Sequence, residues 1–220
     1  MALVIFDLDN TLIAGDSDHA WGEFLVERKI VDAEYYQAKN DQFFQDYQSG
    51  KLKIEEYLAF ALEPLANNAV EDLLSWRDIF LEEKIFPIML PKAKALISKH
   101  REQGDYLLII TATNHFVTEL IAKSLGVDDL IATIPEQNNQ GFTGNITGTP
   151  SFKEGKITRL NTWLENQDLS IDGAYFYSDS HNDLPLLKLV DHPIAVDPDD
   201  TLRAYCEKNN WPIQTLRDDQ

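Results

Sequence analysis

A short apolar run that ends in two carboxylates constrains this chain more than any other feature. Residues 3–6 read Leu-Val-Ile-Phe, and Asp7 and Asp9 follow them. Such a run is typical of a strand that is buried on both faces near the middle of a parallel sheet. Side chains two residues apart in a strand point to the same side, so both carboxylates would crowd one mouth and repel each other without a cation or a shared proton. A polar turn that ends the strand is the alternative interpretation.

Length, charge and cysteine content narrow the class of protein. With 220 residues, 44% of them hydrophobic, the chain can form one globular domain, or one domain and an insert. The formal net charge of −18 disfavours nucleic acid and membrane partners, and it requires a cation inside any phosphate site. No apolar run approaches the roughly 20 residues of a membrane helix, and we expect no signal peptide. Cys206 has no partner for an internal disulfide, which favours a cytoplasmic protein, and no pattern predicts an oligomeric state.

Residues 15–83 carry a different pattern from the rest of the chain. Gly15 and the polar residues after it indicate a hinge followed by the start of a helix. Apolar and aromatic residues then recur at helical spacing, without the alternation that is typical of strands. We therefore predict an all-helical domain at 15–83, inserted after the first strand of a core that comprises residues 1–14 and 84–220.

Strand and helix patterns alternate after the predicted insert. The strand-like runs are residues 106–110, 130–134, 173–177 and 193–196. Strands separated by helices indicate βαβ units, and thus an α/β fold with a Rossmann-like parallel sheet and helices on both faces. Residues 141–148 indicate a hairpin over the sheet or, alternatively, a glycine-rich loop.

Reactive side chains follow several of the predicted strands. Thr111 follows the second strand, and Asp179 and Asp183 follow a later one. Ligands of open α/β sheets bind beyond the carboxyl ends of the strands, so we expect these groups to meet Asp7 and Asp9. Carboxylates gathered at one mouth favour a hard cation, and Mg²⁺ fits best.

A carboxylate beside Mg²⁺ can attack phosphorus and form an aspartyl-phosphate. We predict that Asp7 is this nucleophile, because it comes first after the strand, and that Asp9 protonates the leaving oxygen and later activates water. Lys156 would bring the required cation to the phosphate, with Lys153 as the competing candidate. The predicted phosphate-binding residues are Thr111, Lys156 and Asn182, the last of which could instead orient a neighbour.

In order and spacing, these residues resemble the four motifs of the haloacid dehalogenase superfamily over nearly the whole chain. The matching residues are Asp7, Asp9 and Thr11 in the first motif, Thr111 in the second, Lys156 in the third, and Asp179 and Asp183 in the fourth. An acid at Asp9 resembles the phosphatases of the superfamily, since the dehalogenases lack it. The resemblance implies Mg²⁺ bound by the Asp7 carboxylate, the Asp9 backbone carbonyl and Asp179. Asp183 would support this metal site without direct contact.

The predicted insert lies where this superfamily carries a mobile cap over the active site. An all-helical cap resembles the phosphoserine-phosphatase-like branch, and stretches around the motifs resemble bacterial subfamily IB hydrolases, some described as histidinol-phosphate phosphatases. Two departures distinguish this chain from phosphoserine phosphatases. Ala112-Thr113 stands where they have Gly-Gly, and no arginine lies between Arg28 and Arg77 to clamp a substrate carboxylate.

Three residues at the start of the insert are predicted to set substrate specificity. Asp16, Asp18 and His19 suit a substrate with an amine or another cationic group. Histidinol phosphate, an amine without a carboxylate, satisfies both this acidity and the missing arginine. The sequence thus predicts a Mg²⁺-dependent phosphomonoesterase for a small phosphorylated metabolite, with histidinol phosphate as the candidate. Alternatives are a phosphoserine phosphatase, a phosphotransferase on the same scaffold and, more distantly, a non-catalytic receiver-like protein that binds a phosphoryl group.

Overall fold

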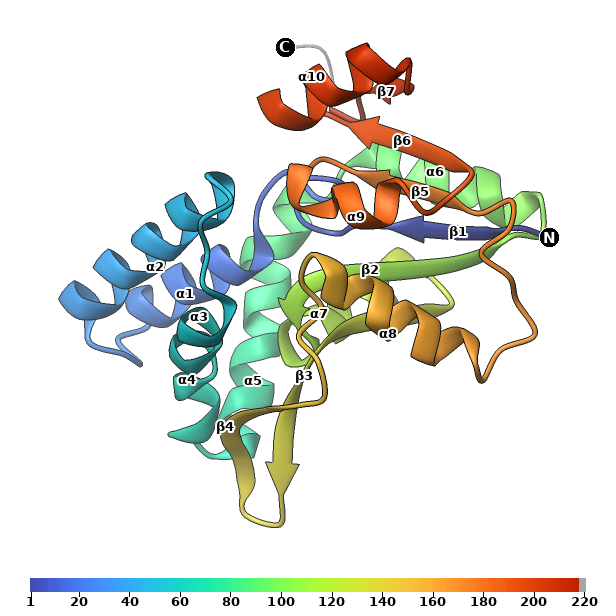
Figure 1. Ribbon diagram of the computed structural model, residues 1–220. Helices are drawn as coiled ribbons and strands as arrows, with labels where there is room; N and C mark the ends of the chain where they lie inside the picture. The colour runs from blue at the N-terminus through green and yellow to red at the C-terminus, as the bar shows by residue number, and fades with distance from the viewer. Residues whose placement is uncertain (218–220) are drawn as a thin grey trace.

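A seven-stranded sheet forms the centre of the computed structural model, which describes residues 1–217 (Figure 1). The strand order is β4-β3-β2-β1-β5-β6-β7, and within these residues all neighbours are parallel except the antiparallel pair β3 and β4. The strands are β1 (Leu3–Phe6), β2 (Tyr106–Asn114), β3 (Asp129–Asn138), β4 (Gly141–Thr147), β5 (Tyr175–Ser178), β6 (His192–Val196) and β7 (Ile213–Gln214). The predicted α/β fold with a mostly parallel sheet is confirmed.

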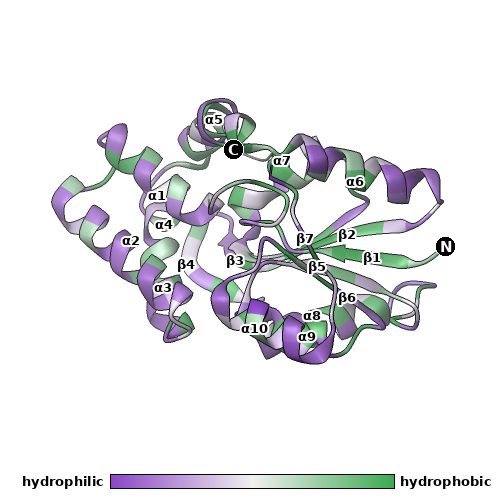
Figure 2. Ribbon diagram, turned by 90° about the horizontal axis from the view of Figure 1, so that it is seen from above, coloured by the Kyte–Doolittle hydropathy of each residue, from purple (hydrophilic) through white to green (hydrophobic). Residues whose placement is uncertain are grey.

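β1 is buried on both faces, as its composition predicts. Val4 and Phe6 belong to one apolar cluster, and Leu3 and Ile5 belong to a second cluster, because successive side chains of a strand point to opposite faces. Helices cover both faces of the sheet (Figure 2). The first face carries α6 (Pro91–Glu102) and α7 (His115–Leu125), and the second carries α8 (Glu154–Leu164), α9 (Leu184–Leu187) and α10 (Asp200–Asn209).

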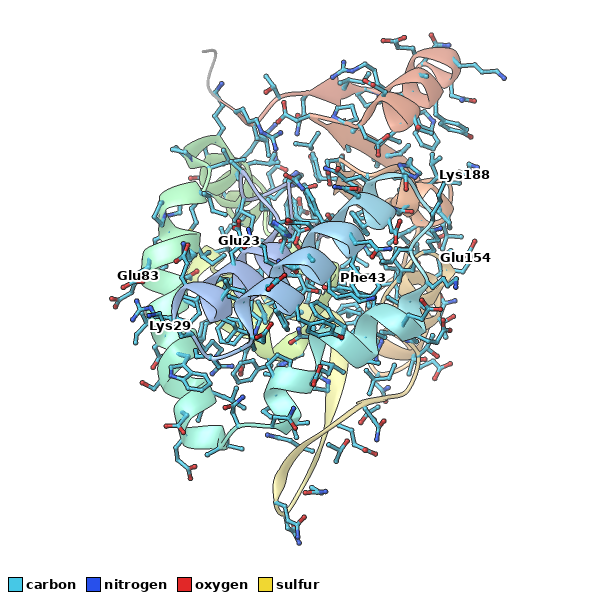
Figure 3. The ribbon with its side chains drawn as sticks, turned by 90° about the vertical axis from the view of Figure 1, so that its left-hand side faces the viewer. Glu23, Lys29, Phe43, Glu83, Glu154 and Lys188 are labelled. Atoms are coloured by element: carbon cyan, nitrogen blue, oxygen red, sulfur yellow. The ribbon has the colours of Figure 1, made fainter. Side chains whose placement is uncertain are left out.

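Between β1 and α6 the chain is helical, as its periodicity predicts. The helices are α1 (Ser17–Glu27), α2 (Ala33–Gln48), α3 (Ile54–Ala61), α4 (Glu63–Ala66) and α5 (Val70–Phe80), followed by short turns at Leu81–Ile85 and Phe86–Ile88. We call α1 to α5 the helical insert and the sheet with α6 to α10 the core. The insert lies beyond the carboxyl ends of the parallel strands (Figure 1), and Figure 3 looks onto it. No helix within residues 1–217 is both long and apolar enough to cross a lipid bilayer.

The insert and the core share one apolar cluster. The ring of Trp21 in α1 lies 5.1 Å from that of Phe80 in α5 and 6.0 Å from that of Phe116 in α7. All three residues belong to the cluster that also holds Val4 and Phe6 of β1. Packing of this kind fixes the base of the insert against the first face of the sheet.

Three segments differ from the prediction, the first being the short edge strand β7, which matches none of the predicted strands. β2 continues beyond residue 110 through Asn114, because β-branched Thr111 and Thr113 suit an extended strand. Residues 141–147 form β4, which pairs antiparallel with an extended β3 and turns back at Asn138 and Gly141. This segment is therefore the second strand of a hairpin with β3 at the edge of the sheet, and it is not a separate hairpin over the sheet or a loop.

Candidate active site

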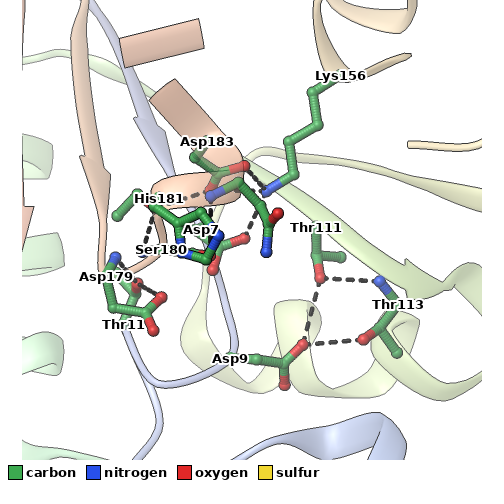
Figure 4. Close-up of polar contacts among 12 residues, drawn as sticks. Asp7, Asp9, Thr11, Thr111, Thr113, Lys156, Asp179, Ser180, His181 and Asp183 are labelled. Atoms are coloured by element: carbon green, nitrogen blue, oxygen red, sulfur yellow. Dashed lines mark hydrogen bonds and ion pairs between the residues drawn. The ribbon is translucent and has the colours of Figure 1, made fainter. Parts of the chain in front are cut away.

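Asp7 lies directly after β1, at the centre of the sheet edge. Its backbone N–H donates to the carbonyl of Tyr177 in β5 over 2.9 Å, which anchors residue 7 to the neighbouring strand. The Nζ atom of Lys156, near the start of α8, lies 2.8 Å from Asp7 Oδ1 (Figure 4). Lys156 reaches the carboxylate because the first turn of α8 packs closely against the loop that contains Pro150. A side chain at Gly155 would place its Cβ only 2.0 Å from the carbonyl oxygen of Pro150.

Asp183 shares this lysine. Lys156 Nζ lies 2.7 Å from Asp183 Oδ1 and 2.8 Å from Oδ2, and Ser178 Oγ donates to Oδ2 over 2.7 Å. Burial opposes the charge of the ammonium group, but Asp183 and Asp7 together raise the pKa of Lys156 above its usual value. The lysine therefore stays protonated. Both oxygens of Asp183 therefore contact the ammonium group of Lys156, and one of them also accepts from Ser178.

Asp179 follows β5 on the other side of Asp7. Its Oδ1 accepts a hydrogen bond from Thr11 Oγ1 at 3.1 Å, and its backbone N–H donates to Thr11 Oγ1 at 3.0 Å. Burial, together with the charge of Asp7, raises the pKa of Asp179 well above its ordinary value. Burial also raises the pKa of Asp7 to about 7, although Lys156 pulls it down. The buried Asp7 and the half-buried Asp179 therefore repel each other at this point, and one lysine does not balance them.

The oxygen atoms at this site fit a hard divalent cation. Asp7, Asp179 and Asp183 bring three negative charges against the single positive charge of Lys156. Asp7 and Asp179 could bind a metal ion directly, whereas both oxygens of Asp183 already contact Lys156. Mg²⁺ fits this donor set, because this ion is bound through one or two carboxylates and keeps several water ligands.

Asp9 has a separate network on the side of the helical insert (Figure 4). Its Oδ1 accepts from the backbone N–H of Ser17 at 2.6 Å, and its Oδ2 accepts from Thr113 Oγ1 at 2.9 Å. Thr111 Oγ1 lies 3.4 Å from Asp9 Oδ2. Burial, together with a neighbouring carboxylate, raises the pKa of Asp9 to about 6. A carboxyl group with such a pKa can give and take a proton near neutral pH, whereas Asp7 is paired with a cation.

A pocket lies between the insert and the ends of the strands. From the core it is lined by Asp7, Asp9, Thr111, Ala112, Thr113 and Phe152, and from the insert mainly by acidic and aromatic residues. The residues on the insert side are Asp16, Asp18, His19, Asn40, Phe43, Phe44, Tyr47, Leu52, Ile54 and Tyr57. No lysine or arginine is among the lining residues of this pocket in the described part of the chain. Four carboxylates border it, so it favours a cationic group over an anionic one.

The three residues predicted to set specificity all line this pocket, with different surroundings. Asp16 is the N-cap of α1, and its Oδ1 accepts from the backbone N–H groups of Asp18 and His19 at 3.0 and 2.9 Å. Asp18 accepts a hydrogen bond from the Tyr57 hydroxyl. Burial raises the pKa of Asp16 to about 6 and that of Asp18 to about 7. The ring of His19 stacks on Phe44 with centroids 4.7 Å apart.

Two other predicted residues join the insert to the core. The side-chain amide of Asn182 donates to the carbonyl of Tyr47, and Lys153 Nζ donates to the carbonyl of Gly50, each over 3.2 Å. Lys153 therefore contacts the insert, while Lys156 is the lysine that contacts Asp7. These bonds hold the end of α2 against the loops that carry the reactive groups.

Several partners in the site were missed by the sequence analysis. Thr113 donates to Asp9, Ser178 donates to Asp183, and Tyr57 donates to Asp18. The alternation of side chains in a strand offered a signal for Thr113, because residues two apart point to the same side and Thr111 was already a candidate. Tyr57 offered no such signal, since the packing of α3 on α1 cannot be read from helical spacing alone.

The sequence of this chain is similar to those of known proteins. The family model described as haloacid dehalogenase-like hydrolase matches residues 4–188. The chain is 45% identical over 219 residues to a protein from Neisseria meningitidis serogroup C named histidinol-phosphatase, covering 98% of this chain and 99% of that one. It is 27% identical over 226 residues to a phosphoserine phosphatase from Mycobacterium tuberculosis, covering 98% and 71% of the two chains.

Solved structures show the same architecture. A protein of unknown function from Bordetella pertussis Tohama I superposes with a TM-score of 0.92 at 39% identity, covering 98% of this chain and 99% of that one. A phosphoserine phosphatase, solved as an analogue of its phospho-aspartyl intermediate, superposes with a TM-score of 0.71. The second pair is 17% identical and covers 99% and 94% of the two chains, so this likeness concerns the fold alone.

Proposed function

The chain belongs to the haloacid dehalogenase-like hydrolases and is a phosphatase of that family, and from this premise we propose that it hydrolyses histidinol phosphate through a covalent intermediate on Asp7. One observation carries the proposal. A buried Asp7 at the end of the central strand contacts the buried Lys156 at 2.8 Å and opens into a pocket bordered by acidic side chains. That arrangement supports phosphate chemistry at one end of the pocket and recognition of a cationic group at the other.

The proposed reaction has two steps. In the first, an Asp7 oxygen attacks phosphorus, the bond from phosphorus to the substrate oxygen breaks, and Asp9 gives its proton to the departing alcohol. In the second, Asp9 takes a proton from water, the water oxygen attacks phosphorus, and Asp7 is released with inorganic phosphate. Lys156 stabilises negative charge at Asp7 and on the phosphoryl oxygens in both steps.

Mg²⁺ is the cofactor in this proposal. The Asp7 carboxylate, the Asp9 carbonyl and Asp179 would hold it, and when bound it offsets the negative charge of the phosphate. Asp183 positions Lys156 for the same purpose, since its two oxygens contact the lysine ammonium group.

We propose that the helical insert acts as a cap over this site, with residues 15–83 as the cap and residues 1–14 and 84–220 as the core. Thr111 stays a proposed phosphate-binding residue because it lines the pocket beside Asp9. For Asn182, its contact with Tyr47 supports the alternative role of orienting the cap. We also propose a cytoplasmic enzyme, since Cys206 is buried and free.

A comparison of substrates tests the proposal. Release of phosphate would be measured with histidinol phosphate, phosphoserine and p-nitrophenyl phosphate, each with Mg²⁺ and with excess EDTA, and with water as the sole acceptor. We expect kcat/KM for histidinol phosphate to exceed that for phosphoserine by about 100-fold, because an unpaired carboxylate in an acidic pocket costs several kcal/mol. Beryllium fluoride should inhibit by occupying Asp7. Full activity in EDTA, or equal use of the two substrates, would contradict the proposal.

A further inference from the structure

Asp18 and Tyr57 meet in the pocket although 39 residues separate them. Asp18 is in the first turn of α1, Tyr57 is on α3, and the Tyr57 hydroxyl donates to Asp18 Oδ2. Both residues line the pocket that also contains Asp7. No hydrogen bond or ion pair among residues 1–217 reaches the other oxygen, Asp18 Oδ1. Asp18 therefore carries a carboxylate with one neutral partner and one acceptor atom available to a ligand.

The other acidic groups of the pocket are better compensated. Asp16 accepts two backbone N–H groups at the positive end of the α1 dipole. Asp9 accepts from a backbone N–H and a threonine hydroxyl, and Asp7 is paired with Lys156. Only a neutral hydroxyl contacts Asp18 in the described structure. A half-buried carboxylate without a counter-ion gains from a ligand that brings a positive charge.

The surroundings of Asp18 select an organic cation over a metal ion. The Tyr57 ring lies edge-on to Phe43 with centroids 5.4 Å apart, and His19 stacks on Phe44 nearby. Aromatic faces attract ammonium and imidazolium groups. They offer none of the several oxygen ligands that Mg²⁺ requires.

We propose that Asp18 binds the cationic end of the substrate and that Tyr57 is a positioning residue that holds Asp18 toward the pocket. This inference rests on the proposed phosphatase function and adds the residues that recognise the cation of the substrate. The substrate is the phosphate monoester of an alcohol that carries a protonated amine or imidazolium group and no carboxylate. Its phosphate lies at Asp7, and its cation lies at the insert wall of the same pocket.

Steady-state kinetics on three substrates tests the pair. The substrates are histidinol phosphate, the same ester without its amine, and p-nitrophenyl phosphate, which has no cation. For Asp18→Asn we expect kcat/KM on histidinol phosphate to fall about 30- to 100-fold, mostly through KM, because a charge-assisted hydrogen bond is lost. Tyr57→Phe should cause a fall of about fivefold. Both variants should lose less activity on p-nitrophenyl phosphate than on histidinol phosphate, because p-nitrophenyl phosphate brings no cation to Asp18.

Two further variants serve as controls. Glu55→Gln removes an exposed carboxylate on the same helix as Tyr57 and should change none of the three substrates. Asp18→Glu keeps the charge and should recover part of the selectivity that Asp18→Asn loses. An equal loss on all three substrates with Asp18→Asn, or no loss on histidinol phosphate, would overturn the assignment.

Binding of histidinol, the alcohol product, separates this inference from the proposed function. Calorimetric titration needs no turnover, and we expect the affinity of Asp18→Asn for histidinol to be about 30-fold weaker than that of the parent chain. If the parent hydrolyses no phosphate ester but binds histidinol through Asp18, the proposed function fails and the inference stands. If hydrolysis proceeds and histidinol binds both proteins equally, the inference fails and the phosphatase function stands.

Discussion

The carboxylates on the two sides of the pocket have different partners. On the core side, Asp7 and Asp183 share the ammonium group of Lys156, with Nζ to oxygen distances of 2.7 to 2.8 Å. On the insert side, Asp18 has only the hydroxyl of Tyr57, and Asp16 has backbone N–H groups. In the core, Lys156 supplies a cation at the site that we assign to the phosphate. In the insert, no cation contacts Asp18 among the described residues, so a cationic substrate would neutralise its charge.

This difference assigns the reaction to the core and the choice of substrate to the insert. The core network ties together residues from β1, α8 and the segment after β5, so the reacting atoms have fixed positions. The insert contributes side chains from α1, α2 and α3 to the opposite wall of the pocket. A change in the insert can therefore alter which ester is accepted and leave the reaction at Asp7 intact.

Replacement of the nucleophile should have the largest effect. Asp7→Asn removes the attacking oxygen, so we expect kcat to fall about 10⁵-fold or more on every substrate, as when other covalent catalysts lose their nucleophile. The amide can still accept a hydrogen bond from Lys156, so the thermal unfolding midpoint should change by only a few degrees. Activity within tenfold of the parent, measured on p-nitrophenyl phosphate, would refute the role of Asp7.

Asp9→Asn should have a smaller effect that depends on the leaving group. Loss of a general acid and base lowers kcat by about 10²- to 10⁴-fold for histidinol phosphate. The nitrophenolate group leaves without a proton, so rapid mixing should show a burst of one nitrophenol per active site, followed by slow turnover. A linear time course without a burst would contradict the assignment of Asp9 to the second step.

The stability of the two walls can be compared directly. Lys156→Met leaves Asp7 and Asp183 buried without a counter-ion, so we expect the free energy of unfolding to fall by about 3–5 kcal/mol. Lys84→Met breaks an ion pair with Glu27 whose side chains are 27% and 56% exposed, and it should cost less than about 1 kcal/mol. Urea unfolding at pH 7.5 without Mg²⁺ measures both values. Equal losses would show that the buried ion pairs of Lys156 contribute no more to stability than the exposed pair of Lys84.

Much of the core could be predicted because its signals are local. The apolar run from Leu3 to Phe6 predicts a central strand, and the carboxyl ends of parallel strands lie at one edge of the sheet. The order of the motifs therefore predicted that Asp7, Lys156 and Asp183 lie close together. In the structure, Lys156 contacts both carboxylates. The parts that were missed depend on continuation of a strand, as in β2 through Asn114, or on pairing at an edge, as in β4.

The insert resisted prediction for a physical reason. Helical periodicity shows which residues are apolar, but not which helices lie side by side or which face borders a pocket. Asp18 could be predicted as a specificity residue because it lies with Asp16 and His19 at the start of the insert, where acidic groups suit a cationic substrate. Its partner Tyr57 depends on how α3 packs, and nothing in the local pattern distinguishes this tyrosine from those of the apolar cluster.

The smallest expected effect concerns the stability cost of the insert acid. Burial raises the pKa of Asp18 from 3.8 to about 7. Between these values the native state binds a proton that the unfolded chain releases, so this group stabilises the fold as pH falls from about 7 to about 4. At pH 8 the carboxylate is charged in both states and only the native state bears the cost of burial. Asp18→Asn should therefore raise the free energy of unfolding by about 1–2 kcal/mol at pH 8.

The gain from Asp18→Asn should shrink toward zero near pH 4, because the native carboxyl is then neutral in the parent as well. Urea unfolding of parent and variant at pH 8, 6 and 4.5 measures this trend, with Glu55→Gln as the exposed control that should follow the parent throughout. A variant less stable than the parent at pH 8 would mean that Asp18 supports the fold through Tyr57. A stability gain at pH 8 joined to a loss of selectivity for histidinol phosphate would instead show that the insert retains an unfavourable buried charge because the substrate neutralises it.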